Sequence, residues 1–98
     1  YYGAPVVVLV LADGNTNTFI EDGSCVLENM MLAAASLGLG LVWVHRERGI
    51  LTISKARRFL RNGGVSESLR GVGAIALGYP ASSDVKAAER KENYIVRI

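Results

Sequence analysis

The stretch from Glu21 to Arg48 constrains the fold of this chain more than any other part of the sequence. An amphipathic segment rich in small residues leads into Gly38-Leu39-Gly40 and then into the apolar run Leu41–Val44. This order predicts a helix, a glycine-rich stop and a short buried strand. The polar cluster His45–Gly49 follows directly, so the strand is expected to carry polar side chains to one edge of the fold.

The helix within this stretch is expected to begin near Asp22 or Ser24, because either side chain can accept a hydrogen bond from a first-turn N–H group. Gly38 is expected to end it in a left-handed conformation, and Cys25 is expected to pack within it. The apolar stripe is wide, which predicts burial on more than one side. One row of the stripe is Val26, Met30, Ala33 and Leu37, and the row beside it is Leu27, Met31 and Ala34.

The remaining elements alternate between strands and helices. Ala4–Leu11 is a continuous run rich in β-branched residues, which predicts a strand buried on both faces. Gly71–Leu77 predicts a third buried strand, and Tyr94–Ile98 a final short strand after a polar extension. Because that extension is long for an internal hairpin, the final strand is expected to pair away from its own body. A short helix capped by Thr52 or Ser54 is expected to run through Leu60, with Ala56 and Leu60 inward and with Arg57, Arg58 and Arg61 outward. The predicted fold class is α/β (α+β layered): three buried strands, flanking helices and a C-terminal arm strand.

Length, composition and charge limit the function. Ninety-eight residues suffice for one domain, and an apolar fraction of 50% is high for so small a body, which favours a partner or a longer parent chain. The apolar runs are too short to span a membrane, and the single cysteine fits a reduced, cytoplasmic setting. Residues 46–98 carry all 11 basic residues. Arg57, Arg58 and Arg61 form a basic helical face, but no nucleic-acid motif accompanies it. A solvated face is therefore the favoured interpretation, and no nucleic-acid partner is expected.

The order of these segments resembles the C-terminal half of the nitroreductase family of FMN-dependent NAD(P)H oxidoreductases. The matching segments are GAPVVVLVLAD, EDGSCVLENMMLAAASLGLG, LVWVHR, GVGAIALGYP and ERKENYIVRI. The resemblance implies that residues 1–98 are the C-terminal portion of an FMN-binding domain, about half of the fold, without its N-terminal portion. It also implies a homodimer with an interface flavin site, in which hydride passes from NAD(P)H through the flavin to a nitroaromatic, quinone or similar acceptor. The 98-residue piece alone is expected to be inactive.

The resemblance also implies a set of cofactor contacts. Gly40 would allow close approach to the flavin ring, and Trp43, Val44, His45 and Arg46 would line it. From the residues alone, Trp43 is a core side chain, His45 an ordinary surface or capping histidine, and Gly38-Leu39-Gly40 a helix stop. The resemblance assigns the FMN phosphate to Arg90 and Lys91, with Arg90 favoured for its bidentate guanidinium. A solvated charge run between Glu89 and Glu92 is the alternative.

Neither a catalytic side chain nor a metal site is expected. The sequence holds one histidine and one cysteine, too few for the usual nitrogen and sulfur ligand sets. No nucleophile lies in a context that would activate it. A non-catalytic dimerisation or ligand-binding module of the same fold is the alternative function.

Overall fold

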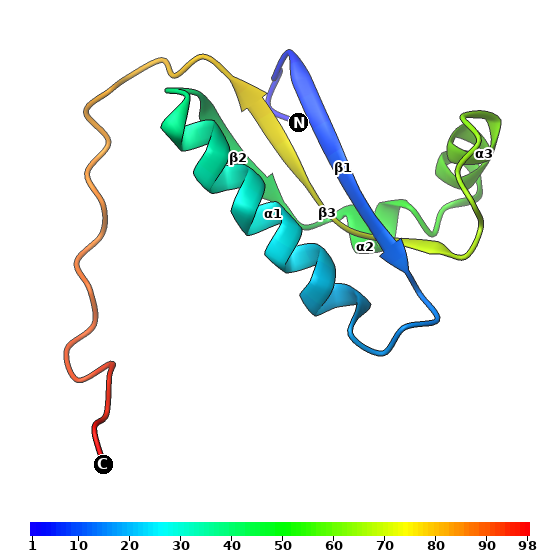
Figure 1. Ribbon diagram of the computed structural model, residues 1–98. Helices are drawn as coiled ribbons and strands as arrows, with labels where there is room; N and C mark the ends of the chain where they lie inside the picture. Colours follow the sequence, from blue (N-terminus) through cyan, green and yellow to red (C-terminus); the bar gives the residue numbers. More distant parts are fainter.

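A three-stranded antiparallel sheet with helices around it forms the body of the chain (Figure 1). The computed structural model describes residues 1–98 apart from the side chain of Ile50. The central strand β3 pairs with β1 on one side and with β2 on the other. In chain order the elements are β1 (Val6–Asp13), α1 (Phe19–Ser36), β2 (Gly40–Val44), α2 (Glu47–Ile50), α3 (Ser54–Asn62) and β3 (Leu69–Gly78). The predicted layered fold class, with helices packed on a sheet, is confirmed.

Helix α1 packs on one face of the sheet and encloses the core. Buried Val10, Leu27, Val72 and Ile75 form its centre. The register between β1 and β3 shifts between Val10 and Leu11, which leaves Val72 as the extra residue of a β-bulge. A bulge can turn two successive side-chain positions to the same face, and here the Val72 side chain lies against Gly23 of α1 while Gly73 lies beside Leu27.

The burial of the strands differs from the prediction. Strand β3 is buried over most of its length, but β1 and β2 are edge strands, and most of their residues are half-buried or exposed. Their side chains are apolar on both faces, yet α1 covers only one. On the opposite face, Val7, Leu9 and Tyr1 border an open apolar hollow of about 310 Å³ together with residues of α2 and α3. The apolar pattern therefore predicts β1 correctly as a strand. It overstates the burial of that strand, because this chain covers only one of its faces.

Helix α1 begins one turn earlier than expected. Its first residue is Phe19 and its N-cap is Thr18, so neither Asp22 nor Ser24 caps it; the Ser24 hydroxyl instead donates to the carbonyl of Ile20. The helix stops as predicted, with Gly38 at φ +73°.

The buried side of α1 is the second of the two predicted rows, together with Gly23. Leu27 and Ala34 are buried and Met31 is half-buried. In the first row Met30 is half-buried against the core, whereas Val26, Ala33 and Leu37 are exposed. Cys25 is exposed rather than packed. Burial on more than one side is wrong for this chain, because only one side of α1 meets the sheet.

The segment between β2 and β3 contains a short helix, α2, that the sequence did not predict. The predicted helix after it is α3, and its N-cap is Ile53 rather than Thr52 or Ser54. The Thr52 hydroxyl donates to the carbonyl of Gly49 instead. Arg57 is half-buried rather than outward, while Arg58 and Arg61 are exposed as expected.

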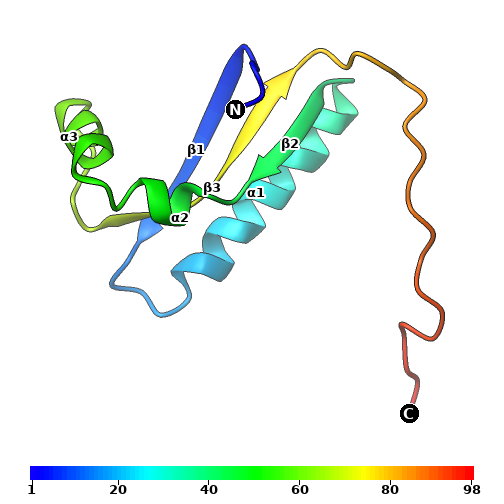
Figure 2. The same ribbon diagram turned by 180° about the vertical axis from the view of Figure 1, so that it is seen from behind.

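Residues 79–98 leave the body as an arm without helix or strand (Figures 1 and 2). The radius of gyration is 16.2 Å, against about 13 Å for a compact chain of 100 residues. Tyr94–Ile98 therefore does not form the predicted strand here, because a strand needs an edge to pair with. Among the helices that the structure describes, none has the length and apolar character needed to cross a membrane.

Candidate functional site

The end of β2 gathers four of the predicted flavin contacts. Trp43 pairs with Ile75, and Val44 with Ala74, in the register with β3. The indole of Trp43 lies on the α1 face, where its Nε1 would be 2.6 Å from a Cβ added to Gly73. Gly73 thus makes room for the indole, and 37% of Trp43 stays exposed. Trp43 packs against the sheet as a core side chain would, with one part open to a ligand.

The polar side chains of this site follow immediately. His45 and Arg46 are both exposed, and Arg46 is the N-cap of α2, where its carbonyl accepts a bond from the N–H of Gly49 at 3.0 Å. The backbone thus turns away at Arg46 and leaves two donor side chains beside an apolar strand end. This arrangement suits a flat ligand that needs apolar cover and hydrogen-bond donors.

Gly40 lies at the other end of β2, next to the root of the arm. A Cβ at Gly40 would stand 3.2 Å from the Cα and 3.3 Å from the nitrogen of Pro80. The close approach that requires glycine here is therefore that of the chain itself. Gly40 also borders a broad hollow of about 570 Å³ that includes Tyr79 and Pro80.

Arg90 and Lys91 are not brought to the end of β2. They lie on the exposed arm and, with Glu89 and Tyr94, border a hollow formed by arm residues alone. In the part of the chain that the structure describes, the one ion pair joins Arg61 and Glu67 at 2.6 Å. The two basic side chains are thus exposed and available to an anion, but the body of this chain does not position them.

Glu47 is a polar residue of this region that sequence reasoning missed. Its side chain is fully buried, with an exposed fraction of 0%. The hydroxyl of Tyr1 donates to its Oε1 at 2.5 Å, and Oε2 has no hydrogen-bond partner among the described residues. The segment HRERG looks like a solvated turn, and no sequence signal distinguishes its glutamate from an exposed one. Burial arises because α2 turns Glu47 under the sheet.

The ionisation of Tyr1 gives a test of this contact. The hydrogen bond to Glu47, partial burial and the nearby carboxylate charge together raise the pKa of Tyr1 to about 12, from an ordinary value of 10. Because the folded pKa is raised, the stabilisation is fully present below pH 10 and is lost between pH 10 and 12. Spectrophotometric titration is expected to show a component near pH 12 that Tyr1→Phe removes and Glu47→Gln shifts downward. Tyr94→Phe, on the exposed arm, should leave that component in place.

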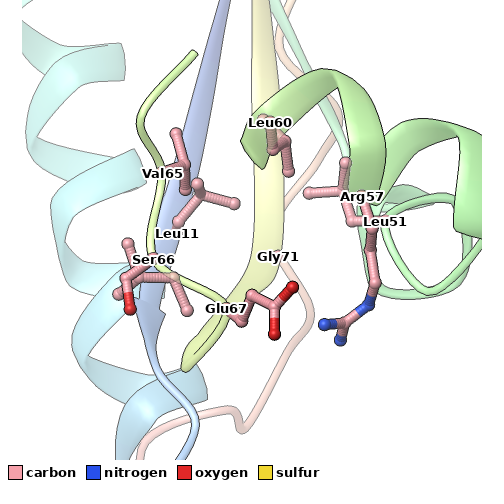
Figure 3. A pocket seen from close by; sticks show the side chains of 9 residues that line it. Leu11, Leu51, Arg57, Leu60, Val65, Ser66, Glu67 and Gly71 are labelled. Carbon is pink, nitrogen blue, oxygen red and sulfur yellow. The ribbon is translucent and has the colours of Figure 1, made fainter. Parts of the chain in front are cut away.

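A small hollow beside α3 is a packing gap rather than a site. Figure 3 shows Leu11, Leu51 and Leu60 around it, with the charged ends of Arg57 and Glu67 on one side. Its volume is about 20 Å³, which is enough for roughly one water molecule. The end of β2 remains the candidate cofactor site.

The chain resembles known proteins over most of its length. The family model described as "Nitroreductase family" matches residues 1–79. A protein of Methanothermobacter thermautotrophicus, provisionally named an NADH dehydrogenase/NAD(P)H nitroreductase, is 32% identical over 85 residues, which are 82% of this chain and 42% of that protein. The chain therefore spans less than half the length of this curated relative.

Solved structures give the same result. A nitroreductase with bound FMN from Bacteroides fragilis matches with a TM-score of 0.90 and 32% identity, covering 100% of this chain and 53% of that one. An FMN-dependent nitroreductase from Clostridium difficile matches with a TM-score of 0.65 and 28% identity, covering 89% of this chain and 51% of that one. This chain belongs to the nitroreductase family.

Proposed function

We propose that the protein containing this chain is an FMN-dependent oxidoreductase that uses NAD(P)H. The observation that carries the proposal is the match, along the whole chain, to a nitroreductase with bound FMN. When bound, FMN would supply the redox chemistry, accepting a hydride from NAD(P)H and passing reducing equivalents to a nitroaromatic, quinone or similar acceptor. We place this activity in the cytoplasm.

The end of β2 is proposed to face the flavin ring. Val44 and the open part of Trp43 would provide apolar cover, while His45 and Arg46 would donate hydrogen bonds to the ring's polar edge. Gly40 would contribute backbone at the far end of the strand. The role of these residues is to bind and orient, and we assign none of them a proton-transfer step.

A homodimer would complete the site. Arg90 and Lys91 are proposed to hold the FMN phosphate, and the arm that carries them makes no regular pairing with its own body. Tyr94, Ile95 and Val96 on the same arm are each 80% exposed, which is unfavourable for apolar side chains unless a partner covers them. An arm that reaches over a second copy would bury these residues and deliver the basic pair to the partner's flavin.

Reconstitution tests the proposal. The full-length protein, incubated with FMN and freed of excess cofactor, is expected to show flavin absorbance and to oxidise NADH or NADPH in the presence of an acceptor. Because Trp43 is the only tryptophan of this chain, its contribution to the fluorescence should be quenched as FMN binds, and Trp43→Phe should remove that contribution. A full-length protein that stays colourless after incubation with FMN contradicts the proposal.

A further inference from the structure

A second pocket lies between the start of α1, the end of α2 and the start of β3. Its volume is about 140 Å³. The residues that line it are Phe19, Arg48, Leu51, Thr52, Arg70 and Gly71. Two of them are arginines and none is acidic. The pocket is therefore a concave site of positive charge with one aromatic and one aliphatic wall.

Arg70 is held in place by the backbone around it. Its Nη1 donates to the carbonyl of Glu67 at 2.6 Å and to that of Leu69 at 3.2 Å. Its aliphatic stem lies against Gly14, since a Cβ at that glycine would be 2.6 Å from Cγ of Arg70. One nitrogen of the guanidinium is thus fixed, and the remaining N–H groups are left for another acceptor. A donor fixed in this way loses little conformational entropy when it binds an anion.

The carboxylates next to these arginines in the sequence are already engaged. Glu47, which precedes Arg48, is buried and accepts the hydroxyl of Tyr1. Glu67, near Arg70, pairs with Arg61 at 2.6 Å. Both pocket arginines consequently lack a carboxylate partner within the described part of the chain, and two neighbouring positive charges without a partner favour an anion.

We propose that Arg48 and Arg70 form an anion-binding pocket that receives an oxyanion group, a phosphate or a carboxylate, of a small-molecule substrate. The pocket is distinct from the Arg90–Lys91 pair on the arm. Guanidinium groups bind both oxyanions through paired N–H donors. Phe19 and Leu51 suit the carbon body that carries the oxyanion. Only the assignment of the anion to a redox substrate rests on the proposed function.

Direct titration of the full-length protein with inorganic pyrophosphate, followed by calorimetry, tests the pocket without any redox reaction. Arg48→Gln and Arg70→Gln are each expected to weaken binding about tenfold, the loss of a charge-assisted hydrogen bond. Gly14→Ala keeps both charges but displaces the stem of Arg70, so it is expected to weaken binding as well. Arg58→Gln is the matched control, since Arg58 is an exposed arginine of α3 that does not line the pocket.

The outcomes decide the pocket. The proposed pocket is supported if Arg48→Gln and Gly14→Ala lose affinity for pyrophosphate and Arg58→Gln does not. Arg48→Gln and Gly14→Ala should both still fold, because neither removes a core side chain. Equal affinity in all variants, equal loss in Arg58→Gln, or no binding of pyrophosphate by the wild-type protein at millimolar concentration overturns the proposed pocket. Flavin plays no part in this titration. A negative titration would therefore overturn the pocket without bearing on whether the protein binds FMN.

Steady-state kinetics then identify the source of the oxyanion. If it is the 2′-phosphate of NADPH, Arg48→Gln should raise KM for NADPH about tenfold and leave KM for NADH unchanged. If it is the carboxylate of an acceptor, the same variant should raise KM for 4-nitrobenzoate and not for 4-nitrobenzyl alcohol. Unchanged KM ratios in both pairs overturn the assignment of the anion to a substrate.

Discussion

Gly23→Ala is expected to destabilise the fold by about 2 kcal/mol, although alanine is the better helix former by about 1 kcal/mol. Gly23 lies within α1 and faces β3. An added Cβ would stand 2.5, 2.8 and 2.9 Å from Cγ2, Cβ and Cγ1 of Val72. These atoms belong to a short β-branched side chain of the central strand, so they cannot swing away. Denaturant unfolding of the full-length protein should show this loss of stability as a midpoint at lower denaturant concentration.

A double-mutant cycle separates this clash from a general effect on the helix. Val72→Ala removes two of the three atoms that the new methyl group would meet. Gly23→Ala should therefore cost about 1 kcal/mol less in the Val72→Ala background than in the wild type. Gly49→Ala is the control, because nothing lies within 4 Å of a Cβ at that helical glycine. Additive losses in the cycle contradict the clash.

The sequence predicted the helices and strands better than it predicted which of their side chains are buried. The β-branched run before the first loop, the wide apolar stripe after it and Gly38 identified β1, α1 and the left-handed stop, because these signals are local. The choice between the two rows of α1 depended on the β-bulge, which turns Val72 toward Gly23. A bulge shifts the register by one residue and leaves no clear mark in the apolar pattern.

The candidate site was likewise predictable only where it depends on local sequence and not where it depends on tertiary contacts. The apolar run ending in His45 and Arg46 predicted a strand end with donors, and the structure has one. The burial of Glu47 was not predictable, because it depends on a short helix that carries this residue under the sheet to Tyr1. The positions of Arg90 and Lys91 relative to the strand end were not predictable either, because they depend on what the exposed arm contacts.

Arg90→Ala is expected to weaken FMN binding by the full-length protein about tenfold to a hundredfold, because it removes a charge-assisted contact to the phosphate. Arg90→Lys should recover part of the loss, since an ammonium group keeps the charge without the bidentate fork. Quenching of flavin fluorescence measures both affinities. Lys86→Ala is the matched control on the same arm.

Riboflavin makes the test specific for the phosphate, because it carries the same ring without that group. Arg90→Ala should leave riboflavin affinity unchanged while FMN affinity falls, so the ratio of the two affinities moves toward one. If Arg90→Ala weakened the binding of FMN and riboflavin equally, Arg90 would have a structural role in the arm and would not contact the phosphate. If the FMN affinity of Arg90→Ala equals that of Lys86→Ala, then Glu89 and Glu92 flank a solvated charge run and the phosphate is held elsewhere.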